Sequence, residues 1–188
     1  MSGRQTLAVK RFAVMSLQDA AYDTCAIAAA VARLQSQQGA TVIVADAAPG
    51  PSPFDGIFGT TAGPGLAELL SGRATFSSII ARDALTGAHY LRAGLDRAAA
   101  NSYIMGERMD MVLEALEGAY DVVLLHTGCG FGLPAALARK CQGALILASG
   151  SHQAETGRVI HDLREAGLRA VQAARLTGSA AMREPQVA

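Results

Sequence analysis

The sequence predicts a three-layer α/β/α domain in which a parallel sheet carries helices on both faces. Apolar runs of strand length alternate along the chain with longer, helix-like segments. The strand-like runs lack polar alternation, which is typical of strands that are buried on both faces. The 188 residues, 51% hydrophobic and 17% charged, suit one domain over 1–188 with a sizeable core.

The first half of the chain begins with an apolar strand near 11–16. An alanine-rich, largely apolar segment over 24–34 predicts a buried helix, which ends near Gly39. A β-branched run over 41–46 predicts a second strand, which ends in Asp46 and leads into a loop rich in proline and glycine.

The rest of the chain continues the alternation. Helical pieces are expected at about 65–71 and 75–81, a strand at 88–93, a long helix at about 101–118, strands at 121–126, 143–149 and 168–174, and a helix at 154–166. Ligands of such sheets bind outside the carboxyl ends of the strands. The loops 16–23, 46–53 and 126–132 are therefore the places to look for a site.

The composition excludes several classes of function. Sixteen basic and 16 acidic residues give a net charge of zero, so no nucleic-acid partner is expected. The cysteines, Cys25, Cys129 and Cys141, are odd in number and scattered, which fits neither a disulfide framework nor a zinc site. No apolar run reaches the ~18 residues of a membrane span, and residues 1–10 lack a secretion signal. We expect a cytoplasmic domain, held at the inner membrane only through a partner or a fused segment.

Several segments carry a resemblance by their order and spacing. The first strand leads to Ser16 and a loop over 17–24, and the second strand ends in Asp46 followed by Ala48. Further on, 57–59 read Ile-Phe-Gly, 65–72 read Gly-Leu-Ala-Glu-Leu-Leu-Ser-Gly, and 120–127 read Tyr-Asp-Val-Val-Leu-Leu-His-Thr. Together they resemble the bacterial tyrosine kinases of capsule and exopolysaccharide export, in the superfamily of chromosome-partitioning and septum-site ATPases. The resemblance implies a P-loop NTPase-like (Rossmann-like) fold.

The chain departs from this family at its phosphate-binding loop. A P-loop uses glycines to curl backbone N–H groups around phosphates, and a lysine to neutralise them. Tyr22 occupies the position of the glycine before the lysine, and Asp23 occupies that of the lysine. Aspartate reverses the sign of a contact worth about 4 kcal/mol at 4 Å and an effective dielectric constant of 20. Thr24 alone matches the family, where a hydroxyl ligates magnesium.

The two other motifs are also altered. The second aspartate of the strand-end Asp-x-Asp is Ala48, and the Walker B aspartate is His126, a poor ligand for a hard cation. Three losses together disagree with phosphoryl transfer, which depends on positioning and charge neutralisation. We therefore predict no catalytic residue, no metal and no cofactor. A vestigial nucleotide site remains at Ser16, Tyr22, Asp23, Thr24, Asp46, Ala48 and His126, and we expect the Tyr22 ring to fill the space of the phosphates.

Other residues invite chemical interpretations, each with a simpler structural one. Thr24 and Asp46 either retain magnesium or cap a helix and a turn. His126 and Cys129 suggest a base with a nucleophile, but no third, orienting group is evident. Gly128-x-Gly130-x-Gly132 is a weak dinucleotide pattern. Three arginines form either an anion-binding surface or a solvated face (Arg158, Arg164, Arg169). Three methionines belong either to the core or to an exposed docking face (Met105, Met109, Met111).

Three functions follow from these observations. The first is a non-catalytic, pseudokinase-like domain that acts by protein contact in the biosynthesis or export of exopolysaccharide or capsular polysaccharide. The resemblance implies that its partner is the cytoplasmic part of a membrane-embedded polysaccharide co-polymerase, fused or separate; a homo-oligomer is compatible with the sequence. The second is an active ATP- and magnesium-dependent tyrosine kinase or ATPase of the same pathway with an atypical site. The third is a small-molecule enzyme with His126 as its acid or base.

Overall fold

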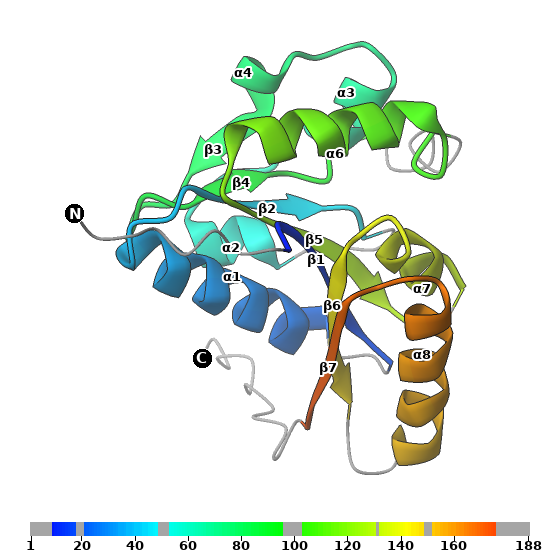
Figure 1. The fold of residues 1–188 in the computed structure, drawn as a ribbon. Coiled ribbons are helices and arrows are strands. Elements are labelled where there is room, and N and C mark those ends of the chain that lie inside the picture. The colour runs from blue at the N-terminus through cyan, green and yellow to red at the C-terminus, as the bar shows by residue number, and fades with distance from the viewer. Residues whose placement is uncertain are drawn as a thin grey trace, which may run out of the picture.

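The structure is a computed structural model, and it describes residues 9–17, 21–48, 53–95, 103–130, 132–148 and 152–175. Strands and helices alternate along this part of the chain (Figure 1). The strands are β1 (Arg11–Ser16), β2 (Val42–Asp46), β3 (Ile80–Arg82), β4 (His89–Leu91), β5 (Val122–Cys129), β6 (Gly143–Ala148) and β7 (Ala170–Arg175). The helices are α1 (Ala21–Gln37), α2 (Phe54–Phe58), α3 (Leu66–Leu70), α4 (Phe76–Ile79), α6 (Glu107–Ala119), α7 (Gly132–Ala138) and α8 (Gln153–Glu165).

The strands form one seven-stranded sheet in the order β3-β4-β2-β5-β1-β6-β7. Every neighbouring pair is parallel except β3 and β4, which are antiparallel. The five strands expected to be parallel are confirmed, as is the α/β sheet class. The four central strands are buried along most of their length, which explains why their sequences are continuous apolar runs.

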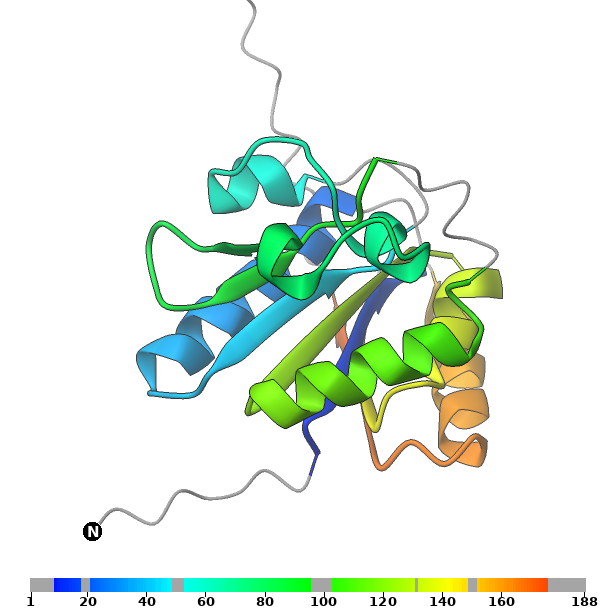
Figure 2. The ribbon, with the colours of Figure 1, turned by 90° about the horizontal axis from the view of Figure 1, so that it is seen from above.

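Helices cover both faces of the sheet (Figures 1 and 2). One core joins the sheet to α3, α4, α6, α7 and α8, and the other joins it to α1 and α2. The right-handed crossover rule explains the division, because β1 connects through α1 in one direction along the sheet, and β5 and β6 connect through α7 and α8 in the other. None of the helices in the described part of the chain has the length and apolar character of a membrane span.

Three local predictions are wrong or incomplete. The helix expected over 75–81 ends at Ile79, because the chain continues as the edge strand β3. The loop expected at 126–132 begins later than predicted: β5 runs on to Cys129 through a bulge, with Gly128 at a φ of 91°. Such a bulge absorbs one extra residue without ending the pairing. The short helices α2 and α7 were not anticipated.

Candidate functional site

Polar side chains gather at the carboxyl ends of the central strands. Asp46 ends β2 and lies in register with His126 of the neighbouring β5. Thr24 lies in the first turns of α1, and Ser16 ends β1. All four are buried, although polar residues are rarely found so deep in a core. The strand-end site expected from the sequence therefore exists as a buried polar cluster.

Three side chains of this cluster form a chain of contacts. His126 Nδ1 lies 2.9 Å from Asp46 Oδ1, and His126 Nε2 lies 3.7 Å from the Sγ of Cys25 in α1. With the imidazole in its neutral form, the Nδ1–H donates to the carboxylate and Nε2 accepts from the thiol. The network thus ties β2, β5 and α1 together at one point.

Asp46 makes one further hydrogen bond, and its second carboxylate oxygen has no hydrogen-bond partner among the described residues. Its Oδ1 also accepts a hydrogen bond from the backbone N–H of Ala48 at 3.1 Å, which confirms the expected turn cap. Among the described residues, Asp46 Oδ2 and Thr127 Oγ1 are buried without a hydrogen-bond partner. Both groups belong to the strand-end cluster, because Asp46 pairs in register with His126, the residue before Thr127.

Aromatic rings close the cluster on its α2 side. The Phe54 ring meets the His126 ring edge to face, with centroids 5.1 Å apart. Phe54 stacks on Phe58 at 5.7 Å, and Phe58 stacks on Tyr90 at 5.0 Å. As a result Cys25 and Asp46 are 0% exposed and His126 is 1% exposed. Solvent does not reach the three side chains.

The geometry is unsuited to a magnesium ion. Both ring nitrogens of His126 are engaged, one by Asp46 and one by Cys25. Magnesium requires several oxygen ligands in an octahedral arrangement, and among these three side chains only Asp46 carries oxygen. Within the described ranges, no group of three or more His, Cys, Asp and Glu side chains is arranged to hold a metal ion.

Asp23 occupies the first turn of α1. The amino end of a helix attracts a negative charge, which is how P-loops hold phosphate. A carboxylate at this position satisfies the helix with a charge from the chain itself, by about 0.3–1 kcal/mol. Asp23 is thus explained as a stabilising helix residue, without a ligand.

The remaining predicted positions have mixed outcomes. The helix begins at Ala21, so the interpretation of Thr24 as its cap is wrong: the residue is buried inside the helix. Ala48 is buried beyond the end of β2. The ring of Tyr22 lies outside the described side chains, as do the loop residues 18–20 and 49–52.

The thiol beside His126 belongs to Cys25, where the sequence had suggested Cys129. Cys129 lies opposite Ser16, beyond the bulge of β5. The third, orienting group that the sequence did not reveal is Asp46. The signal was the register of two adjacent parallel strands, each ending in a polar residue. In an open cleft this order of thiol, imidazole and carboxylate would activate a nucleophile. Here the buried thiol offers a substrate no access, and the arrangement is a structural network.

Other candidate groups lie apart from the cluster. Burial raises the pKa of the Cys141 thiol to about 12, so this cysteine is unreactive. Gly128 lies inside β5 and Gly132 opens a helix of seven residues, which is not a dinucleotide loop. The three arginines are exposed, as both the solvated-face and the anion-surface interpretations require (Arg158, Arg164, Arg169). The methionines divide: Met109 is fully buried, whereas Met105 and Met111 are exposed.

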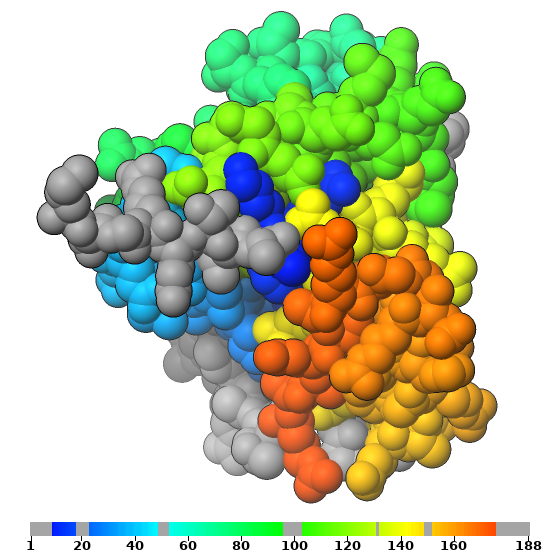
Figure 3. All heavy atoms as spheres, viewed as in Figure 1, coloured from blue at the N-terminus to red at the C-terminus, as the bar shows by residue number. Residues whose placement is uncertain are grey.

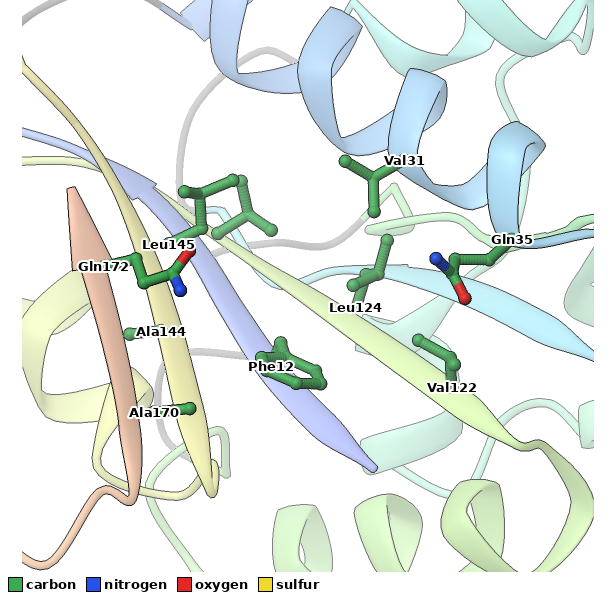
Figure 4. A pocket seen from close by; sticks show the side chains of 10 residues that line it. Phe12, Val31, Gln35, Val122, Leu124, Ala144, Leu145, Ala170 and Gln172 are labelled. Carbon is green, nitrogen blue, oxygen red and sulfur yellow. The ribbon is translucent and has the colours of Figure 1, made fainter. Parts of the chain in front are cut away.

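A separate hollow lies on the α1 face of the sheet, toward the amino ends of the strands (Figure 4). It encloses about 270 Å³ and is lined by strand residues such as Phe12, Val122 and Ala170 and by Val31 of α1. Its only polar lining side chains in the described part of the chain are Gln35 and Gln172. The hollow is apolar and uncharged, and none of the side chains that line it belongs to the Asp46–His126–Cys25 contacts.

Comparison with known proteins places the fold. No protein-family model matches the sequence, and a search of curated proteins finds no match. The structure is similar to the kinase domain of the Escherichia coli tyrosine kinase ETK (TM-score 0.73, 19% identity, covering 94% of this chain and 71% of that chain). It is similar to the VpsO kinase domain (0.73, 18%, 90% and 86%). It is also similar to the septum site-determining protein MinD of Pyrococcus horikoshii, solved with Mg-ADP (0.74, 19%, 86% and 67%).

These likenesses confirm the fold expected from the sequence, a P-loop NTPase-like α/β domain. They also confirm, as a likeness of fold, the resemblance to bacterial tyrosine kinase domains. At identities below 20% for these three structures, they speak for the fold alone.

Proposed function

We propose that this chain is a kinase-fold domain without phosphotransfer activity, which acts by protein contact in the biosynthesis or export of exopolysaccharide or capsular polysaccharide. The observation that carries the proposal is the Asp46–His126–Cys25 network. At the strand ends, where this fold class binds ligands, the chain has an interior that is closed and internally hydrogen-bonded.

Two further features support the loss of nucleotide chemistry. Asp23 puts a negative charge at the amino end of α1, which repels a phosphate. Phe54 packs against His126, so a ligand approaching the imidazole would have to displace an aromatic ring from a stacked cluster. The partner suggested by the likeness to kinase domains is the cytoplasmic segment of a membrane-embedded polysaccharide co-polymerase, and the domain would work at the inner face of the membrane.

Isothermal titration calorimetry with ATP and with ADP, each with magnesium, tests this proposal. We expect no measurable binding. A dissociation constant below about 100 μM, or about −5.5 kcal/mol, would refute the pseudokinase proposal and favour the active kinase or ATPase of the same pathway.

A set of reversions separates lost ligands from a remodelled pocket. The variant Tyr22→Gly, Asp23→Lys, Ala48→Asp and His126→Asp restores the family residues at four positions. We expect at most weak nucleotide binding, because the Phe54 and Phe58 rings still occupy the α1 side of the strand ends. Full recovery of binding would mean that only charges and ligands have been lost.

A further inference from the structure

The outer side of α6 and the turn before it expose large apolar side chains. Six large hydrophobic side chains in the described residues are exposed, and three of them lie within the stretch 103–111. Tyr103 is 41% exposed, Met105 is 43% exposed and Met111 is 68% exposed. Single exposed hydrophobic residues are ordinary, whereas a cluster of them marks a contact surface. Among the described helices and strands, Figures 1 and 2 show none over the outer side of α6.

Contacts with the core and with neighbouring residues fix the position of α6 and of the turn before it. Met109, Leu113 and Leu116 anchor α6 in the core. The Arg108 guanidinium donates from Nη1 to the carbonyl of Leu70 at 2.6 Å, and it lies 5.7 Å from the centre of the Tyr103 ring. Arginine, tyrosine and methionine side chains together are typical of protein-binding surfaces. The arginine and tyrosine provide contact area at low entropic cost, and the flexible methionines adapt to the shape of the partner.

The charges on this side of α6 are acidic. The helix has four acidic residues and one basic residue. Asp110 pairs with Lys140 at 2.6 Å, and Glu117 pairs with Arg11 at 3.5 Å. The exposed Glu107 and Glu114 have no ion-pair or hydrogen-bond partner within the described ranges. They stand four residues before and three residues after Met111, so the three side chains share one row of the helix.

We propose that this α6 surface, made of Tyr103, Met105, Glu107, Met111 and Glu114, docks a basic amphipathic segment next to a membrane span of a partner. The inference rests on the proposed function for the class of partner. Segments that flank a span on the cytoplasmic side are enriched in lysine and arginine, so they complement an acid–methionine–acid row. The hollow of Figure 4, in contrast, offers no charge to select such a segment.

Site-specific photo-crosslinking in the native cells tests the surface. A benzophenone amino acid replaces Met111 in the full chain, and a control chain carries it at the exposed Arg158 of α8. We expect the Met111 probe to capture a membrane protein through a peptide of net positive charge, within about 20 residues of a span. Capture of a soluble protein, of an acidic segment, or of nothing from Met111 would overturn the proposal.

Charge reversal provides the matched control. Glu107→Lys with Glu114→Lys should lower the cross-link yield about tenfold, because two rim pairs become repulsive. Asp162→Lys with Glu165→Lys makes the same charge change on α8 and should leave the yield unchanged. Equal losses from both double variants would overturn the proposal, since long-range charge alone would then explain them. Thermal unfolding of each variant checks that the fold is intact.

The two proposals fail separately. Tight ATP binding with an intact Met111 cross-link would remove the pseudokinase proposal and leave the surface. Capture of the membrane protein from Gln172 in the hollow, but not from Met111, would leave the proposed function and remove the α6 surface.

Discussion

The two faces of the sheet are built from different side chains. The face covered by α3, α4, α6, α7 and α8 has a core of aliphatic residues, in which no aromatic side chain is fully buried among the described residues. The face covered by α1 and α2 holds the buried rings of Phe54, Phe58 and Tyr90, together with the Asp46–His126 pair. One face of the sheet therefore has an aliphatic core, and the other has a core that contains aromatic rings and a buried polar pair.

The difference lies at the strand ends, where this fold class binds ligands. On the α1 face the helix contributes the small side chains of Ala28, Ala29 and Ala32, which let it lie close to the sheet. The aromatic rings and the polar network then occupy the strand ends. Within the described residues, the opposite face has an aliphatic core without such a polar network. Figure 3 shows the residues of α6 (green) and α8 (orange) on the outside of the molecule.

The largest effect is expected for Phe54→Ala. If the strand ends on the α1 face are packed as core, the variant loses about 3–5 kcal/mol of unfolding free energy. Leu113→Ala, in the opposite core, is the matched control at about 2–5 kcal/mol. Chemical denaturation measures both. A loss for Phe54→Ala below about 1 kcal/mol, against the full loss for the control, would indicate an open ligand site with replaceable walls.

Asp46→Ala should be the next most damaging. It removes the acceptor of the His126 imidazole and of the Ala48 N–H in an environment without solvent, at a cost of about 3 kcal/mol. A double-mutant cycle with His126→Ala isolates the pair. We expect a coupling free energy of about 1–3 kcal/mol. Strictly additive losses would show that the two side chains contribute separately and that no network exists.

Asp83 gives the α1 face a dependence on acid pH. It is 2% exposed and receives hydrogen bonds from Arg33 at 2.8 and 3.1 Å. Burial raises its pKa, but the hydrogen bonds from Arg33 and Thr86 and the charge of Arg33 outweigh burial and lower the pKa overall. Since the folded pKa lies below the unfolded value of about 3.9, the carboxylate stabilises the fold above that pH. This stabilisation is lost as the pH falls through the folded pKa.

Asp83→Asn should therefore cost about 1.5–3 kcal/mol at pH 7 and flatten the decline in stability below about pH 4. Asp162→Asn, on the exposed side of α8, is the control and should change neither. Urea unfolding from pH 7 to pH 3 measures both. An unchanged acid slope in the Asp83 variant would show that another carboxylate sets the acid stability.

The sequence predicted the parallel strands of the sheet well, because strands that are buried on both faces consist of continuous apolar runs. It singled out Asp46 and His126 separately, as residues at the ends of parallel strands, but it did not predict their contact. It did not predict Cys25 as the third member, because that contact depends on the rotation of α1 above the sheet. Nor did it predict β3, a three-residue edge strand whose residues continue a helix-like stretch. Contacts fixed by helix rotation and short edge pairing leave no periodic signal.

The smallest effect is expected where the α1 face lacks a covering helix. Gln172 is exposed in β7 and lines the hollow, while its neighbour Val171 points into the opposite core and is 7% exposed. Because no described element covers this exposed side chain, Gln172→Ala should change the unfolding free energy by less than about 0.5 kcal/mol. Val171→Ala should cost about 1.5–3 kcal/mol, because it removes buried methyl groups from the same strand. Parallel urea melts of the two variants, at two protein concentrations, measure the contrast. A loss for Gln172→Ala near that of Val171→Ala would show that the hollow is covered in solution. If that loss grew with protein concentration, the cover would be a second copy of the chain, and the two faces would be more alike than the isolated fold indicates.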